Sequence, residues 1–241
     1  MELKEMIYKR KSVRKYKSEP VDKATLEKIS KACSELIPLY PEIKVKAEII
    51  GKENVRCILP WTTPQLIAVF SEVKIGYLEN IGFMFQQMDL YLESLGLGSC
   101  WLGMGKLDSY EGDASADGLR FVIMLAFGYP KEELRSKPSQ FRRKALSEIS
   151  DSEDIRLEPA RLAPSSVNSQ PWYFIHKDGL IHTYCVRQGI FKNKALSKIN
   201  KIDIGIALSH IYLTNPETFI FFVTDDAPSV KGYQYTGTVI I

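Results

Sequence analysis

The ten residues Ala163-Pro164-Ser165-Ser166-Val167-Asn168-Ser169-Gln170-Pro171-Trp172 form the most informative stretch of this 241-residue chain. Two prolines restrict the backbone, while three serines, an asparagine and a glutamine offer hydroxyl and amide groups. A tight surface loop would account for the same composition without any ligand. Polar loops on a rigid scaffold often carry function, however, so we favour a loop that binds the polar edge of a heteroaromatic ligand.

A second stretch, Arg10-Lys11-Ser12-Val13-Arg14, places two guanidinium groups, an ammonium group and a hydroxyl within five residues. Arginine suits a phosphate group because its planar fork makes paired, charge-assisted hydrogen bonds. Arg142-Arg143-Lys144 is a further basic cluster. Taken alone, either cluster is equally typical of a solvated face.

A third stretch, Gly96-Leu97-Gly98-Ser99-Cys100-Trp101-Leu102-Gly103, contains three glycines that would let the backbone approach a flat ligand closely. The chain has no G-x-G-x-x-G motif, which disfavours a Rossmann nucleotide site. His176, His182 and His210 lack metal-ligand spacing, so we expect no metal site.

The composition is that of an ordinary globular protein, with 45% hydrophobic and 25% charged residues. Four cysteines without a CxxC pair favour a reducing compartment. The first residues do not resemble a secretory signal, and no apolar run approaches the ~20 residues of a membrane span. A net charge of +3 is too small to indicate nucleic acid. We therefore expect a cytoplasmic chain with no nucleic-acid or membrane partner.

Apolar periodicity and turn residues divide the chain into helices and strands. The expected helices cover residues 2–10, a segment that starts at Asp22 and is ended by Pro38 and Pro41, and residues 79–95, 154–162 and 202–213. The expected strands lie within residues 43–59 and at 64–70, 121–127, 172–175, 180–185, 218–224 and 233–241. Residues 136–154 have the polar composition of a connector.

Two of the expected helices share a pattern. Asn80-Ile81-Gly82 begins one of them and Asp203-Ile204-Gly205 occurs in the other, with a polar residue five positions after each glycine, at Gln87 and His210. An apolar strand follows each helix. This repetition predicts two related halves, residues 1–148 and 149–241.

The three stretches, together with Gly128-Tyr129-Pro130 and Arg142-Arg143-Lys144, resemble the hallmarks of the FMN-dependent nitroreductase family. The resemblance implies an α+β fold in which each half has a mainly antiparallel sheet with helices. In the family the arginine–serine motif and the proline–serine–asparagine loop are close in one sequence, and FMN lies between two subunits. Here about 150 residues separate them, which implies a fused, intertwined pseudo-dimer: a monomer that holds one FMN between its halves.

The resemblance also implies a function, the transfer of hydride from NADH or NADPH through flavin N5 to a nitroaromatic, a quinone or a similar small acceptor. The flavin would carry the chemistry, so no catalytic side chain is expected. An FMN-binding sensor or storage protein without turnover would share these motifs and is the alternative, and a scaffold that has lost its cofactor is a further one.

Family motifs carry over to twelve cofactor-binding positions. Arg10, Ser12 and Arg14 are expected at the phosphate and ribityl groups with Arg143 or Lys144, and Lys11 could belong to this set or be solvated. Pro164, Ser165, Ser166 and Asn168 are expected at the isoalloxazine and ribityl groups, and the backbone of Leu102 and Gly103 near N5. Gln87 matches a family amide but could equally be an interior helix residue.

Overall fold

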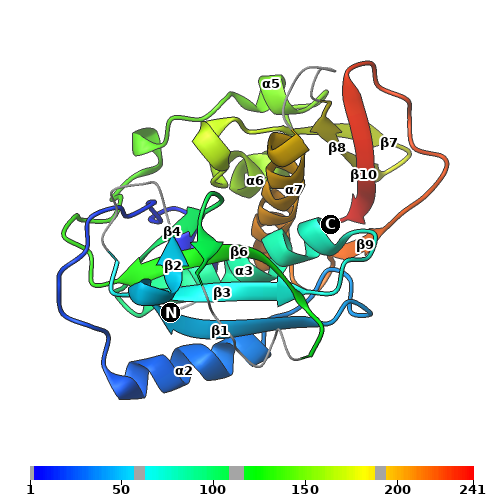
Figure 1. Cartoon of the computed structure of the whole chain (residues 1–241). Coiled ribbons are helices and arrows are strands. Elements are labelled where there is room, and N and C mark those ends of the chain that lie inside the picture. The colour runs from blue at the N-terminus through cyan, green and yellow to red at the C-terminus, as the bar shows by residue number, and fades with distance from the viewer. Residues whose placement is uncertain (1–2, 57–62, 109–116, 188–193) are drawn as a thin grey trace. The chain divides into compact units, whose positions relative to one another are not determined.

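A computed structural model describes residues 3–56, 63–108, 117–187 and 194–241 of the chain (Figure 1). The chain forms two compact units. The first unit comprises Met1–Tyr77 and Gln87–Pro138, and the second unit comprises Leu78–Gln86 and Ser139–Ile241. The expected division into related halves at residue 148 stays a prediction, because a unit defined by packing need not coincide with a repeated half.

The first unit is built on a four-stranded antiparallel sheet of order β1-β3-β6-β4. Its strands are β1 (Val45–Gly51), β3 (Gln65–Ser71), β6 (Arg120–Gly128) and β4 (Gly98–Leu102). The apolar run predicted at 121–127 lies in β6, which is buried from Ile123 onwards, and the run predicted at 64–70 is β3 beside it, so both of these predictions are confirmed. A small ribbon pairs β2 (Val55–Arg56) with β5 (Lys106–Leu107), and a 3₁₀ turn, η1 (Lys52–Asn54), precedes it. Cys57 and the end of the strand region predicted at 43–59 lie outside the described residues.

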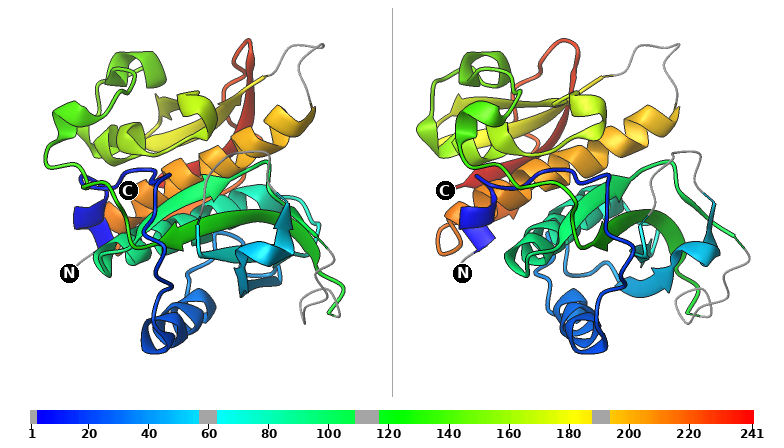
Figure 2. Two further views of the ribbon diagram at one scale, coloured as in Figure 1. Left: turned by 60° about the vertical axis from the view of Figure 1, so that its left-hand side comes forward. Right: turned by 90° about the vertical axis from the view of Figure 1, so that its left-hand side faces the viewer.

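The helices of this part of the chain are α1 (Leu3–Met6), α2 (Lys23–Ser34) and α3 (Tyr77–Ser94). The start of α2 and both ends of α3 agree closely with the predictions, whereas α1 is shorter than the predicted helix 2–10. Asp22 caps α2, because its side chain accepts the Thr25 amide at 3.0 Å. Helix α2 packs on β1, and Figure 2 shows it, in blue, alongside the first sheet. Helix α2 ends earlier than Pro38. The Ile37 N–H donates to the Gln87 side chain at 3.2 Å, and the Gln87 side chain donates to the Ile37 carbonyl at 2.8 Å, so Ile37 does not continue the helix. Gln87 is therefore an interior structural residue.

The second unit has its own antiparallel sheet of order β7-β8-β10-β9. Its strands are β7 (Trp172–Lys177), β8 (Leu180–Val186), β10 (Tyr233–Ile240) and β9 (Ile220–Phe222). The predicted hairpin is confirmed: Asp178 and Gly179 have φ values of 53° and 77°, as a two-residue turn with left-handed backbone requires.

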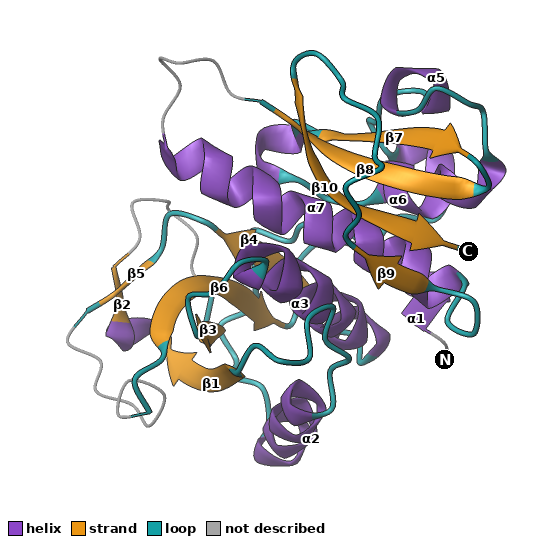
Figure 3. Cartoon of the chain, turned by 90° about the vertical axis from the view of Figure 1, so that its right-hand side faces the viewer, coloured by secondary structure: helices purple, strands orange, loops and turns teal. Residues whose placement is uncertain are grey.

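Helix α7 (Lys194–Thr214) packs against β7 and β8 and is longer than the predicted segment 202–213 (Figure 3). Short helices and turns occupy the expected connector, the helix predicted at 154–162, which is divided into a 3₁₀ turn and a short α-helix, and the loop after it. They are η2 (Pro138–Gln140), α5 (Leu146–Ile149), η3 (Ile155–Leu157), α6 (Glu158–Leu162) and η4 (Ser166–Asn168). Together the two sheets and their helices confirm the expected α+β class. No helix among the described residues is long and apolar enough to cross a membrane.

In the second unit the first part of α3 crosses α7 with glycine on both sides. A Cβ atom on Gly82 would overlap the carbonyl oxygen of Ile202, and one on Gly205 would overlap the carbonyl oxygen of Glu79. Gly82 and Gly205 are 123 residues apart, as are Glu79 and Ile202. The two contacts are therefore reciprocal, with corresponding residues exchanging places.

Candidate functional site

In the first unit the structure brings two of the three informative stretches together. The Val13 amide donates to the Ser99 carbonyl at 2.9 Å, and Ser12 and Ser99 form a parallel β-bridge. The segment 10–14 thus lies along β4, although about 85 residues separate the two in sequence. The segment 10–14 and the start of β4 are therefore neighbours in this unit.

The glycine-rich stretch is a strand, where a ligand-facing loop was expected. Gly98–Leu102 forms β4, an edge strand of the sheet that pairs with β6. Gly96 has φ +77° and ends α3 with the left-handed residue that glycine tolerates best. A Cβ atom on Gly98 would lie 2.6 Å from Val13 Cγ2. Helix ending and close packing therefore account for Gly96 and Gly98, and the close approach of this stretch to a flat ligand stays a prediction. Leu102 is buried at the strand end, and Gly103 is exposed just after it.

Arg10 is almost completely buried, at 1% exposure, in an ion pair. Its Nε lies 2.9 Å from Oδ2 of the fully buried Asp89, and its guanidinium donates to Ser12 Oγ at 3.2 Å. Burial alone would lower the pKa of Arg10, but Asp89 and Glu93 outweigh it and the net direction is upward. Its guanidinium thus has an internal structural role, and its role as a phosphate ligand stays a prediction.

Glu93 binds the backbone of Lys11, the residue after Arg10. Its Oε1 accepts the Lys11 amide at 3.0 Å, and the side chain is 3% exposed. Burial raises the pKa of Glu93 to about 8, with Arg10 opposing and Asp89 reinforcing the shift. The Lys11 ammonium group pairs with half-buried Glu132 at 2.5 Å, while Arg14 is exposed. Lys11 and Arg14 are therefore the cations of this segment that reach solvent.

In the second unit the proline–serine–asparagine loop has an unusual backbone. Val167, Asn168 and Gln170 have φ values of 47°, 57° and 48°, a region that non-glycine residues rarely adopt. Val167 is β-branched and 88% exposed, so packing does not account for its conformation. Such strain persists where the surroundings hold it, and it concentrates at functional sites.

Polar side chains hold this loop in place. Ser165 Oγ accepts the Gln170 amide at 2.9 Å. Asn168 accepts from Arg143 at 2.6 Å and donates to the Arg142 carbonyl at 2.9 Å. The Lys144 amide donates to the Gln170 side chain at 2.8 Å, and Lys144 Nζ donates to the Gln170 carbonyl at 3.0 Å. Arg143 and Lys144 therefore lie at this loop, as parts of its support.

Asp203 on α7 completes the support and was not predicted as a site residue. Both of its carboxylate oxygens lie 3.2 Å from the Ser166 amide nitrogen, and the side chain is 3% exposed. Burial raises the pKa of Asp203 to about 8, and the hydrogen bond from Ser166 lowers it only in part. The available signal was an acid in the middle of an apolar helix, where an uncompensated charge is costly.

The predicted site residues thus form two sets, one in each unit. The first-unit set is Arg10, Lys11, Ser12, Arg14, Leu102 and Gly103; the second-unit set is Arg143, Lys144, Pro164, Ser165, Ser166 and Asn168. Within the described residues, no group of three or more His, Cys, Asp or Glu side chains is arranged to hold a metal ion.

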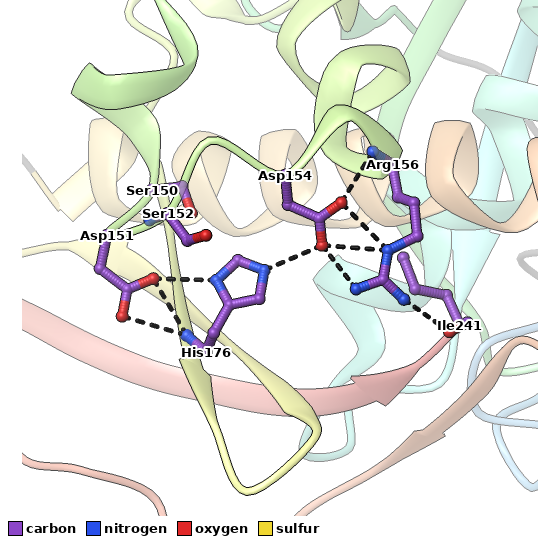
Figure 4. Close-up of polar contacts among 7 residues, drawn as sticks. All are labelled: Ser150, Asp151, Ser152, Asp154, Arg156, His176 and Ile241. Carbon is purple, nitrogen blue, oxygen red and sulfur yellow. Dashed lines mark hydrogen bonds and ion pairs between the residues drawn. The ribbon is translucent and has the colours of Figure 1, made fainter.

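A third polar cluster in the second unit fastens the connector to the edge of its sheet (Figure 4). His176 on β7 lies between two carboxylates, with Nδ1 2.9 Å from Asp151 and Nε2 3.1 Å from Asp154. Arg156 binds Asp154 and also donates to the Ile241 carbonyl at 3.0 Å. Both ring nitrogens of His176 therefore contact carboxylates of the connector. The cluster is structural.

Residues 2–215 match a protein family described as "Putative TM nitroreductase". The chain belongs to this nitroreductase family. The match spans both units and therefore includes both sets of predicted residues. The family assignment and the α+β nitroreductase-like fold expected from the sequence are confirmed.

One solved structure has the same fold along the whole chain. A "putative nitroreductase" from Thermotoga maritima MSB8 is 21% identical, with 100% of this chain and 94% of that chain covered and a TM-score of 0.69. A nitroreductase family protein from Clostridium difficile 630 is 21% identical, covering 64% of this chain and 100% of its own, with a TM-score of 0.47. An FMN-dependent nitroreductase from Clostridium difficile R20291 is 24% identical, covering 53% and 87%, with a TM-score of 0.43. No curated protein matches the chain by sequence.

Proposed function

We propose that this chain is an FMN-dependent oxidoreductase that uses NADH or NADPH to reduce a nitroaromatic, a quinone or a similar small acceptor. Membership of the nitroreductase family supports the reaction class. The observation that carries the proposal is the strained loop of the second unit, in which three non-glycine residues are held in left-handed backbone conformations. A loop with no ligand to bind would gain nothing from that conformation.

The loop has the donor and acceptor groups that a flavin requires. The ring edge and the ribityl chain of FMN present carbonyl, N–H and hydroxyl groups, for which serine and asparagine are suitable partners. The Ser166 side chain is half-buried, and its hydroxyl makes no hydrogen bond with the described residues. Asn168 is exposed beside it and already oriented by Arg143. Ser165 and Pro164 would act mainly by fixing the backbone.

The first unit has groups suited to a phosphate. Lys11 and Arg14 reach solvent from a segment whose backbone is fixed on β4 and on Glu93. Ser12 adds a hydroxyl, although it also accepts from Arg10. Arg10 would contribute mostly by orienting this segment.

We further propose that the chain is a fused pseudo-dimer that acts as a monomer with one FMN. The reciprocal contacts of Gly82 and Gly205 support it, since a two-fold axis makes corresponding residues exchange places. The second support is that the sequence has one arginine–serine motif and one proline–serine–asparagine loop. Bound FMN would supply the two-electron chemistry, and the side chains would bind and orient it.

An absorption spectrum of the purified protein tests the proposal. We expect a yellow protein with about one FMN per chain, bleached by NADH or NADPH without oxygen and restored by a nitroaromatic or a quinone. Flavin that NAD(P)H does not reduce would support a sensor or storage protein. A colourless protein that takes up no added FMN would refute the flavin assignment, and two flavins per chain would refute the single site.

A further inference from the structure

The carboxyl group of Asp203 lies beneath the loop whose strained backbone carries the proposed function. We propose that Asp203 is a positioning residue whose carboxyl group holds the Ser166 amide and couples the shape of the loop to the binding of one proton. The part of this inference that concerns flavin rests on the proposed function.

The hydrogen bond between Asp203 and the Ser166 amide lies where the turn of the loop begins. Ser166 is the first residue of the turn η4, and its amide is bound by both oxygens of Asp203. The residues with left-handed backbone follow from Val167 onwards. In the turn the Asn168 amide donates to the Ser165 carbonyl, and the Ser169 amide donates to the Ser166 carbonyl, each at 3.0 Å. Fixing Ser166 therefore fixes where the strained residues begin.

The charge of Asp203 is uncompensated. Among the described residues no cation pairs with it, and the Ser166 amide is its only hydrogen-bond partner. Among titratable groups, the Cys185 thiol on β8 interacts with Asp203. Lys201 on α7 and Glu79 on α3 act on the same thiol and pair with each other at 3.6 Å. A buried carboxylate in this setting holds a proton up to a pH near 8, since burial favours its neutral form.

A proton held under the loop links ligand binding to pH. Ionised Asp203 places a negative charge beneath groups proposed to hold FMN, which is itself an anion. Binding then favours the protonated carboxyl group, and by reciprocity the proton favours binding. We expect FMN affinity to fall as the pH rises through about 8.

The repeat within the chain suggests the matched variant. Asn80 stands two residues before Gly82, as Asp203 stands two residues before Gly205, and it is also buried. The side-chain carbonyl oxygen of an asparagine at position 203 can accept a hydrogen bond from the Ser166 amide, but this side chain cannot take up a proton. Asp203→Asn therefore separates the proton from the hydrogen bond, whereas Asp203→Ala removes both.

The test is a titration of the flavin-free full chain with FMN between pH 6 and pH 9, followed by flavin fluorescence, for wild type, Asp203→Asn and Asp203→Ala. Above pH 8 the wild-type Kd should rise by up to about tenfold per pH unit, the limit for one linked proton. Asp203→Asn should bind within about threefold of wild type at pH 6 and lose this dependence. Asp203→Ala should bind about tenfold more weakly throughout, as loss of a hydrogen bond to a buried amide predicts.

Identical pH profiles for wild type and Asp203→Asn would overturn the inference and leave the flavin assignment intact. Absence of FMN binding by wild type at every pH would instead refute the proposed function. Hydrogen exchange of the amides in residues 163–172 without flavin then tests the coupling separately. Their protection should change around pH 8 in wild type and not in Asp203→Asn, and equal behaviour of the two would overturn it. Circular dichroism identifies any variant that does not fold.

Discussion

Two buried carboxyl groups, one in each unit, each accept a hydrogen bond from a backbone amide, but the charges around them differ. Glu93 accepts the Lys11 amide in the first unit, and Asp203 accepts the Ser166 amide in the second. Each carboxyl group thus fixes the backbone of an informative stretch from a long helix.

The difference lies in the neighbouring charges. Glu93 and Asp89 share the buried guanidinium of Arg10, and Arg135 also acts on Glu93. Asp203 has no such cation among the described residues. Burial nevertheless raises the pKa of Glu93 and of Asp203 to about 8. Cations therefore offset part of the negative charge in the first cluster, whereas in the second only a bound proton removes it.

The largest expected effect comes from removing the cation of the first cluster. Arg10→Met leaves Asp89 and Glu93 buried without the guanidinium that they share, so the free energy of unfolding should fall by about 3–5 kcal/mol. Urea unfolding at pH 7 measures it, and Arg14→Met, at an exposed position, should change stability by less than about 0.5 kcal/mol. A loss below about 1 kcal/mol for Arg10→Met would show that the ion pair does not compensate the two acids.

The pH dependence of stability separates the two carboxyl groups. A folded-state pKa raised above the ordinary value means that the folded chain keeps a proton that the unfolded chain has released. Stability from that proton is complete at acid pH and is lost as the pH rises to about 8. Relative to that of Asp203→Asn, the free energy of unfolding of wild type should fall by about 1.4 kcal/mol per pH unit between pH 5 and pH 8.

Glu93→Gln should show the same direction with a smaller total change, because Arg10 offsets part of the charge on Glu93. Urea unfolding at four pH values measures both variants. A difference between wild type and Asp203→Asn that does not vary with pH would mean that Asp203 is already ionised in the folded chain.

A smaller effect is expected from the loop itself. Ser165→Ala removes the acceptor of the buried Gln170 amide, which should cost roughly 1–3 kcal/mol. Ser169→Ala, at an exposed position of the same loop, is the control. If thermal unfolding shows equal stabilities for the two variants, Ser165 does not help to hold the left-handed residues.

The smallest effect should follow loss of the Lys11 side chain. Lys11→Met breaks the half-exposed pair with Glu132, worth at most about 1 kcal/mol, and leaves the backbone bond to Glu93 in place. The same variant should weaken FMN binding if Lys11 contacts the phosphate. Unchanged flavin affinity would remove Lys11 from the proposed set.

Local signals explain which elements could be predicted from the sequence. The start of α2, the buried strand β6 and the hairpin of β7 and β8 depend on a cap, an apolar run and a turn, each contained in a few residues. Strand β4 was missed because its glycines are typical of a loop, and only its pairing with β6 makes it a strand. The early end of α2 depends on Gln87, which is 50 residues from Ile37.

The site could be predicted less completely than the fold. The informative stretches themselves were recognisable by composition, and within the second unit Arg143 and Lys144 do lie with Ser165 and Asn168. The burial of Arg10 was not predictable from its neighbours, since Asp89 is 79 residues away. Asp89 and Glu93 lie one turn apart on α3, and this pair of acids on one face of a mostly buried helix was the signal that could have indicated a buried cation.

The glycine crossing of α3 and α7 has a consequence for how this chain can change over generations. Gly82 and Gly205 are encoded by separate codons, so a substitution on one helix leaves the other helix as it was. An assembly of two identical chains has no such freedom, because each substitution reaches both sides at once. Asn80 and Asp203 already differ. A single polypeptide can therefore retain an acid on one side of the crossing and a neutral amide on the other.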